Sequence, residues 1–301
     1  MVMSVPVFSV IIPTYSRPVE LSRCLMALAQ LDYSRDRFEV IVVDDGSDPP
    51  PDSVVAPFQT QLNLTLIRQP NSGPAQARNT GAAVAKGMFL AFTDDDCTPA
   101  ADWLTQLEAH FTVMPDRLIG GKTNNALPDN ACATTSQLII DLVYAYYNAN
   151  PQQARFFASN NFAVSAEQFR AMGGFNPTFF ASEDREFCDR WLDQGYSMLY
   201  APDVQINHAH PLTLRRFWQQ HFNYGRGAYR FYQHRSPASA RQTSPDFYLR
   251  LLTYPLVQTT STHSKLILFA LLVFSQVAST GGLLGERFYQ SSSRLKQVNQ
   301  T

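Results

Sequence analysis

Short runs of apolar, often β-branched residues alternate with helix-type patterns over the first ninety-odd residues of the chain. Turn-forming or helix-starting residues bound each run, as expected for buried strands. Regular alternation of strands and helices is typical of a mostly parallel sheet covered by helices, so the pattern predicts an α/β fold. The predicted strands are 8–13, 38–43, 64–68 and 88–92.

Helices are predicted where apolar residues recur every three or four positions. Pro18 suits a first helical position, and Leu21, Leu25 and Leu28 follow on one face. The other predicted helices run from Pro74 to Lys86 with Gly87 as the stop signal, after Asp102 as the capping residue, after Glu183, and over 214–230.

Two of the predicted strands end in acidic clusters, Asp44-Asp45 and Asp94-Asp95-Asp96. Ligands of open α/β sheets bind outside the carboxyl ends of the strands, so these acids are expected in a crevice. Side-chain alternation along an extended chain would place Asp94 and Asp96 on one side, where a divalent cation relieves their repulsion. A solvated turn is the competing interpretation of either cluster alone. The chain has no GxGxxG or Walker A motif, which excludes those two nucleotide sites.

Several motifs occur in order at regular spacing. They are Pro13-Thr14-Tyr15-Ser16-Arg17, Val43-Asp44-Asp45-Gly46-Ser47, Gly73 to Gly81, Phe92 to Asp96, Gly173-Gly174-Phe175, and Ser182 to Glu186. Together they resemble the family 2 glycosyltransferases, and the resemblance extends over roughly residues 7–230. It implies the GT-A fold, a mixed, mostly parallel sheet sandwiched by helices, here with a helical C-terminal extension, and an inverting, nucleotide-sugar-dependent enzyme.

The resemblance assigns the donor site position by position. Asp94 and Asp96 match the ends of the DxD motif, with Asp96 as the favoured ligand of Mn²⁺ or Mg²⁺ and Asp94 nearer the ribose and the donor sugar. Asp95 stands where relatives often have a small residue. The remaining residues expected to bind the nucleotide-sugar are Pro13, Thr14, Tyr15, Arg17 and Asp45 near the base, and Arg78 near the nucleoside or phosphates.

Glu183-Asp184 matches the family's ED motif, whose aspartate is the usual catalytic base. A purely structural interpretation is that Ser182 caps the following helix while the two acids complement its dipole. The position downstream of the DxD motif favours catalysis by Asp184 and Glu183. Asn160 and Asn161 lie where the family's acceptor site begins, so either is expected to bind the acceptor or only to form a turn.

Two features further along the chain have open interpretations. His208 and His210 would share a face of a strand, and one of them is expected to complete the metal coordination, as in some GT-A enzymes. Arginine and aromatic residues then alternate at helical spacing over 214–230, where Arg226 is expected to meet diphosphate oxygens. A basic face resting on a membrane, and a packed helix with solvated arginines, are the alternatives.

Charge is distributed unevenly over the 301 residues, although the net charge is only −1. Residues 204–301 carry eleven Lys and Arg against two acids, whereas residues 1–203 carry 13 bases and 23 acids. This predicts a metal-binding body and a C-terminal part that meets anions such as phosphates or lipid headgroups. The bases are spread over a hundred positions, so nucleic acid is not expected as a partner.

The expected organisation is a glycosyltransferase domain, 1–235, and a basic, partly apolar helical tail, 236–301. The domain would comprise a nucleotide-sugar half, 1–122, and an acceptor half, 123–235. Residues 266–284 are mostly apolar, but their polar second half favours an interfacial or core helix over a transmembrane one. The N-terminus has no signal-peptide pattern and the four cysteines have no CxxC spacing. We therefore expect a cytoplasmic protein, peripheral at the inner face of a membrane.

The favoured function is transfer of a sugar, with UDP as the favoured carrier, to a hydroxyl of a glycan or a lipid-linked glycan. A nucleotidyltransferase would show a glycine-rich, basic loop after the first strand, and Pro13-Thr14-Tyr15 is not such a loop. The alternative from another class is a non-catalytic nucleotide-sugar-binding scaffold of a polysaccharide-assembly complex. The presence of both Asp96 and Asp184 argues against it.

Overall fold

The computed structural model describes residues 6–235, 247, 250–251, 253–254 and 264–298. Within these residues one mixed sheet of eight strands has the order β3-β2-β1-β4-β7-β6-β8-β5. The strands are β1 (Phe8–Thr14), β2 (Phe38–Asp44), β3 (Leu64–Arg68), β4 (Phe89–Phe92), β5 (Cys97–Pro99), β6 (Leu118–Asn125), β7 (Phe162–Ser165) and β8 (Met198–His208).

Most neighbouring strands are parallel, which confirms the α/β fold class. β1 pairs in parallel with β2 and β4, and β2 with β3. β7 is antiparallel to both β4 and β6, β6 pairs in parallel with β8, and β5 is antiparallel to β8. The carboxyl ends of β1, β2 and β4 therefore lie at one edge of the sheet, where the acidic clusters of the sequence are found.

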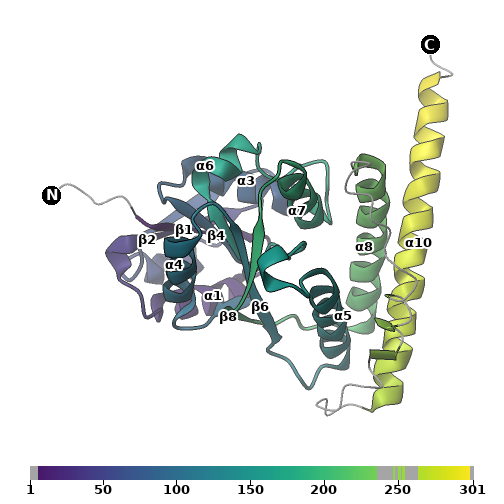
Figure 1. Ribbon diagram of the computed structural model, residues 1–301, viewed down its shortest axis with the longest axis horizontal. Coiled ribbons are helices and arrows are strands. Elements are labelled where there is room, and N and C mark those ends of the chain that lie inside the picture. Colours follow the sequence, from purple (N-terminus) through teal and green to yellow (C-terminus); the bar gives the residue numbers. More distant parts are fainter. Residues whose placement is uncertain (1–5, 236–246, 248–249, 252, 255–263, 299–301) are drawn as a thin grey trace.

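Helices cover both faces of the sheet (Figure 1). Successive residues of β1 point to opposite faces, so Val10 and Ile12 join one buried cluster and Ile11 joins the other. α1 and α4 pack on the first face, and α3, α6 and α7 on the second. The α-helices of this body are α1 (Pro18–Ala29), α2 (Asp52–Val55), α3 (Pro74–Val84), α4 (Trp103–Val113), α5 (Ala131–Tyr147), α6 (Ala166–Ala171) and α7 (Glu183–Asp193), with short 3₁₀ turns at Arg35–Arg37, Ala56–Phe58 and Pro151–Gln153.

Two helix boundaries differ in detail from the sequence-based predictions. α3 ends at Val84 rather than Lys86, because the backbone N–H of Lys86 donates to the buried Glu39 carboxylate at 2.7 Å. Asp102 does precede α4, but its carboxylate accepts from the Gln106 side chain at 2.9 Å rather than from the helix backbone.

Two long helices, α8 (Leu214–His234) and α10 (Lys265–Val298), lie side by side at the edge of the molecule (Figure 1). The ring of Phe217 on α8 stacks on that of Phe274 on α10. Further along both helices Arg226 contacts Glu286, so the two helices run parallel. Glu286 is 1% exposed and accepts from Arg226 Nε at 2.9 Å and from Arg230 Nε at 2.8 Å.

Glycine allows the two helix backbones to approach closely. A Cβ at Gly225 would lie 1.8 Å from the carbonyl oxygen of Ser279, and one at Gly282 would lie 1.9 Å from that of Phe222. Because of this contact, α10 packs on α8 instead of standing away from the domain. The predicted apolar segment 266–284 lies inside α10. The rest of the predicted tail falls outside the described residues, except 247, 250–251, 253–254, 264–265 and 285–298.

Replacing Gly225 with alanine should destabilise the protein, because the new methyl group overlaps the backbone of α10. Overpacking of this kind costs about 1–3 kcal/mol. Gly281→Ala is the matched control, since its Cβ would lie 3.8 Å from the Phe222 ring, an ordinary contact. Thermal unfolding should show a lower Tm for Gly225→Ala and an equal or higher Tm for Gly281→Ala. Equal Tm values for the two variants would contradict the close helix contact.

Candidate active site

Three loops meet at the carboxyl edge of β1, β2 and β4. The backbone N–H of Asp45 donates to the carbonyl of Thr14 at 2.9 Å, which extends the β1–β2 pairing by one residue. The N–H of Ser16 donates to the Ser47 hydroxyl at 2.8 Å. Residues 13–17 and 44–47, both predicted to bind the nucleotide, are therefore neighbours.

Asp45 is buried and organises the loop that leads into α3. Its carboxylate accepts from Gln69 Nε2 at 2.7 Å, from the Ser72 N–H at 2.9 Å and from the Gly73 N–H at 2.9 Å. Tyr15 follows Thr14, the residue whose carbonyl accepts from the Asp45 N–H, and it is 52% exposed. Contact of Asp45 with a nucleobase stays a prediction, and its observed role is to order residues 69–73.

The acidic run after β4 is a turn rather than an extended strand, so the predicted alternation of Asp94 and Asp96 is wrong. The N–H of Cys97 donates back to the Asp94 carbonyl at 3.1 Å, and the Asp94 carboxylate contacts Arg78. Arg17 Nη1 joins the neighbours Asp95, at 3.1 Å, and Asp96, at 2.8 Å. Burial raises the pKa of Asp95 to about 7, although Arg17 opposes this.

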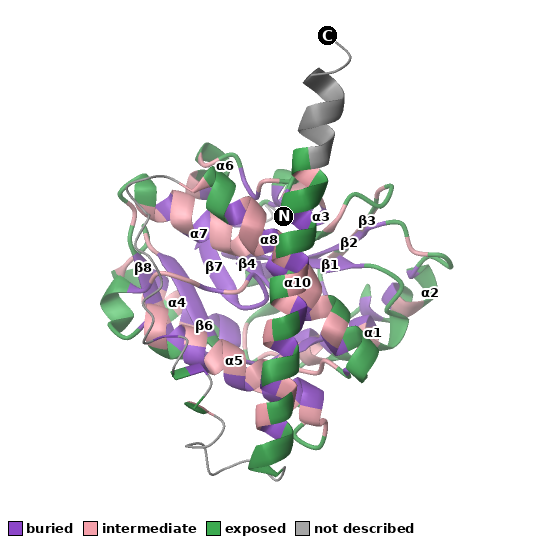
Figure 2. Cartoon of the chain, turned by 90° about the vertical axis from the view of Figure 1, so that its right-hand side faces the viewer, coloured by how far each residue is buried: buried purple, intermediate pink, exposed green. Residues whose placement is uncertain are grey.

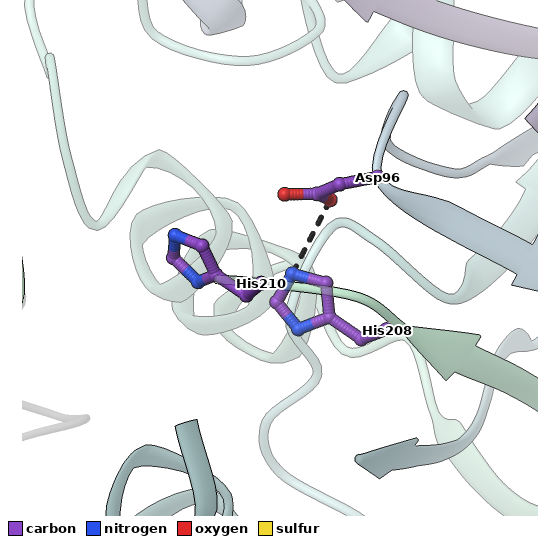
Figure 3. A group of neighbouring side chains, drawn as sticks. All are labelled: Asp96, His208 and His210. Carbon is purple, nitrogen blue, oxygen red and sulfur yellow. Dashed lines mark ion pairs between the residues drawn. The ribbon is translucent and has the colours of Figure 1, made fainter. Parts of the chain in front are cut away.

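Asp96, His208 and His210 form a group whose ligand atoms lie within 4.8 Å of one another (Figure 3). His208 Nε2 lies 3.2 Å from Asp96 Oδ1, and the two imidazole rings are 5.1 Å apart. β8 ends at His208, so only this histidine is on the predicted strand, yet both rings reach the acidic turn. Asp94 is not part of this group and contacts Arg78 instead.

The three residues of this group differ in protonation. Burial opposes ionisation, but the hydrogen bond and charge of His208, with Arg17, hold the pKa of Asp96 well below its ordinary value. Burial and the neighbouring His208 lower the pKa of His210 to about 4, so its ring is neutral at physiological pH. Burial opposes the charge of His208, but its hydrogen bond to Asp96 and the charge of Asp96 raise its pKa, so a metal ion would have to displace its proton. A carboxylate and two imidazole nitrogens are ligands for divalent first-row metals, so the residue types fit Mn²⁺ better than Mg²⁺, which prefers oxygen.

Arg78 connects the acidic turn to the start of α7. Its guanidinium is 3% exposed and donates to Asp94 Oδ1 at 2.6 Å and to Glu183 Oε1 at 2.9 Å. Both terminal nitrogens are thus used by protein carboxylates, and the third nitrogen, Nε, is buried with no partner among the described residues. The structure therefore makes Arg78 a bridge between two motifs, whereas contact with phosphates stays a prediction.

The two acids of the ED pair have different surroundings. Glu183 is buried and ion-paired with Arg78. Burial raises the pKa of Asp184 to about 7, the charge of Glu183 adds to this, and the N–H of Arg185, a 2.7 Å donor, opposes it. Ser182 precedes the helix in a left-handed conformation (φ 68°) with no capping bond from its hydroxyl, so the predicted Ser182 cap is wrong.

The two asparagines predicted at the acceptor site are buried. Asn161 is fully buried. Its Oδ1 accepts from Trp103 Nε1 at 2.9 Å, and its Nδ2 donates to the carbonyls of Lys122 and Val204, each at 3.0 Å. This network ties α4 to β6 and β8, which argues against contact of Asn161 with an acceptor. Asn160 is 9% exposed and makes a single long bond, 3.4 Å, from Thr123.

One predicted residue is engaged by other parts of the protein, and one was missed. Arg226 pairs with Glu286 and lies over the Phe180 ring at 4.3 Å, so its contact with diphosphate oxygens stays a prediction. Tyr224, two residues earlier on α8, was not singled out in the sequence. The residue is 49% exposed overall, but protein atoms crowd around its hydroxyl: this desolvation raises the pKa of the hydroxyl, and so do the charges of the carboxylates, Asp184 first among them. Only the folded position of α8 reveals this neighbourhood.

The chain matches two descriptions of glycosyltransferase families. Residues 9–167, more than half of the chain, match "Glycosyl transferase family 2", and residues 91–280 match "Glycosyl transferase family group 2". Glycosyltransferase AglE of Haloferax volcanii is 29% identical over 206 residues, which cover 68% of this chain and 67% of that protein. Pre-mycofactocin glycosyltransferase of Mycobacterium tuberculosis is 30% identical over 225 residues, which cover 73% of this chain and 46% of that protein. The chain therefore spans about two thirds of the first relative and about half of the second.

Solved structures of similar fold include mannosyltransferase PcManGT from Pyrobaculum calidifontis in complex with GDP-Man and Mn²⁺. Its TM-score is 0.63 at 20% identity, and the match covers 96% of this chain and 80% of that one. S. aureus TarS 1–349 in complex with UDP-GlcNAc has a TM-score of 0.54 at 16% identity, covering 95% and 92%. These likenesses confirm the predicted GT-A type of fold. With the family match, they lead to one conclusion: the chain belongs to family 2 of the glycosyltransferases, and it is a glycosyltransferase.

Proposed function

We propose that the protein is an inverting, metal-assisted glycosyltransferase that moves a sugar from a nucleoside diphosphate to an acceptor hydroxyl. The observation that carries this proposal is the Arg78 bridge, which fixes the acidic turn of the donor side against the ED pair. Asp96 of the candidate metal group lies on the bridged acidic turn, and Asp184, whose pKa is raised, lies at the bridged start of α7.

The donor is expected in the crevice beside the loops after β1, β2 and β4. Residues 13–17 and Asp45 would hold the base and ribose, with Asp94 nearest the donor sugar. UDP remains the favoured carrier and GDP is the second candidate. TarS was solved with UDP-GlcNAc and PcManGT with GDP-Man, and both share this fold.

Asp96, His208 and His210 would hold the metal ion. When bound, the ion would neutralise charge on the leaving diphosphate. The two imidazoles favour Mn²⁺ for this role. Arg17, with a side chain that is 43% exposed and two carboxylate partners, is a second positive charge at the same place.

Asp184 is the group we assign as the base. Its carboxylate would accept the proton of the acceptor hydroxyl as the new oxygen–carbon bond forms. The sugar–phosphate bond breaks on the opposite face, and the nucleoside diphosphate leaves with the electron pair, so the anomeric configuration inverts. The Glu183 carboxylate accepts from Arg78 at 2.9 Å, which leaves Asp184 as the carboxylate available for the proton.

A glycan or a lipid-linked glycan is the proposed acceptor, reached at the cytoplasmic side of a membrane. The basic C-terminal part and the apolar α10 support this location. A non-catalytic scaffold remains the second candidate, and nucleotide binding without transfer would favour it.

Asp96→Asn should weaken metal-dependent nucleotide binding, because it removes the charged ligand of the proposed metal group. Calorimetry with UDP, GDP and dTDP, with and without Mn²⁺, should show one nucleotide whose binding Mn²⁺ strengthens. The variant should lower that metal-dependent affinity by about tenfold or more. Asp102→Asn, which alters an exposed acid before α4, is the control. Unchanged Mn²⁺ dependence in Asp96→Asn would disprove the assignment.

Asp184→Asn should lower kcat by about 10²–10⁴ while nucleotide binding persists, because the amide cannot take the proton. In the wild type, kcat/KM should rise with pH through about 7, since the base is active only when ionised and burial raises its pKa to that value. Asp193→Asn, at the exposed end of α7, should leave both quantities unchanged. A flat pH profile between pH 5 and 9, or an active Asp184→Asn, would refute this role.

Arg78→Met should destabilise the fold by about 3–5 kcal/mol, because two carboxylates lose their shared buried partner. Denaturant unfolding measures this loss, and Arg23→Met on the exposed side of α1 is the control. If the two variants had the same stability, Arg78 would not be the bridge that the structure indicates.

A further inference from the structure

The outer face of α10 is exposed along much of the helix (Figure 2), and much of that exposed surface is apolar. Six of its large apolar side chains are between 38% and 75% exposed: Leu266, Ile267, Val273, Val277, Leu284 and Phe288. We call residues 266–288 on this face the apolar ridge. Soluble proteins rarely expose so long an apolar surface unless something covers it.

The ridge follows the period of the helix. The ridge residues recur at alternating intervals of seven and four, which puts them on one side of the helix: Leu266, Val273, Val277, Leu284 and Phe288. The opposite side is buried by the protein, at positions Leu268, Leu272, Ser275, Ala278 and Glu286. Between Leu266 and Phe288 the helix rises about 33 Å, so the ridge is much longer than a single side-chain contact.

The charges around the ridge indicate what covers it. Glu286 is the only acid in the sequence of α8 and α10, and it is buried against Arg226 and Arg230. Lys265 and Arg287 are exposed near the two ends of the ridge. A surface that is apolar in the middle, basic at its ends and without exposed acids is complementary to the interface of an anionic bilayer.

The packing of α10 decides between lying on a bilayer and crossing it. By length and composition alone, Lys265–Ser291 is long and apolar enough to span a membrane. However, α10 is packed on α8 from Phe274 to Glu286, and α8 exposes Arg215, Arg216 and Gln219. A spanning α10 would have to draw these groups into hydrocarbon or detach from α8, and both are costly.

We propose that α10 is a membrane-docking helix that lies flat in the headgroup region of an anionic bilayer. The apolar ridge would face the lipid, and the opposite side of α10 would stay packed on α8. The proposal concerns binding alone and does not depend on the transfer reaction. α8 then forms the layer between the lipid and the carboxylates of the candidate active site.

Vesicle flotation of the full chain tests this docking. The protein should float with vesicles of phosphatidylcholine and phosphatidylglycerol, and more weakly with pure phosphatidylcholine or at high salt. Val277→Glu should weaken vesicle binding by about tenfold or more. The ridge would lose an apolar side chain that the lipid buries and gain a negative charge that the anionic lipid repels. Ile267→Glu, near the start of α10, is a second variant. Val113→Glu is the matched control, since Val113 is 75% exposed on α4.

Three results would overturn the proposal. The first is vesicle binding that neither ridge variant weakens while both keep the wild-type circular dichroism and Tm. The second is protein that stays with the vesicles after an alkaline carbonate wash, which would mean that α10 spans the bilayer. The third is a protein that never floats with vesicles and that forms a dimer by light scattering in their absence, where Val277→Glu dissociates the dimer. In that case a second copy of the chain would cover the ridge.

Discussion

The buried guanidinium of Arg78 is the interaction on which the candidate site depends. Five carboxylates gather where the donor and acceptor sides meet: Asp94, Asp95, Asp96, Glu183 and Asp184. Such a concentration of like charge would separate the two sides without compensating cations. Arg78 provides the fixed part of that compensation, because it is fully enclosed and bonded to one carboxylate from each side.

The surroundings of each acid then give chemically similar carboxylates different pKa values, and so suit them to different roles. Asp96 stays ionised beside His208 and Arg17, which suits a metal ligand. Asp184 is desolvated, lies next to the charged Glu183 and gains a raised pKa, which suits a base. This contrast is why we assign a metal-assisted displacement to the site and not mere nucleotide storage.

Local patterns in the sequence were sufficient for the first four of the eight strands, most helices and the acidic motifs, because β-branched runs and the turns that end them involve only neighbouring residues. They did not delimit β5, β6, β7 or β8. They were insufficient wherever a contact joins distant segments. The Arg78–Glu183 pair connects residues 105 positions apart, and Asn161 receives its bond from Trp103, 58 positions away. The turn at Asp95–Asp96 replaced the expected extended chain because Thr14 and Arg17, which come from another loop, hold Asp95. Tyr224 and the position of Arg226 likewise follow from how α8 packs.

The proposed manganese site at the acidic turn can be located by anomalous diffraction. Crystals grown with Mn²⁺ and the bound nucleoside diphosphate should show a manganese peak within bonding distance of Asp96 and of at least one of His208 and His210. The diphosphate should lie on the same ion, with its base against residues 13–17. A fully occupied nucleotide with no manganese peak, or with a peak remote from Asp96, would contradict the account.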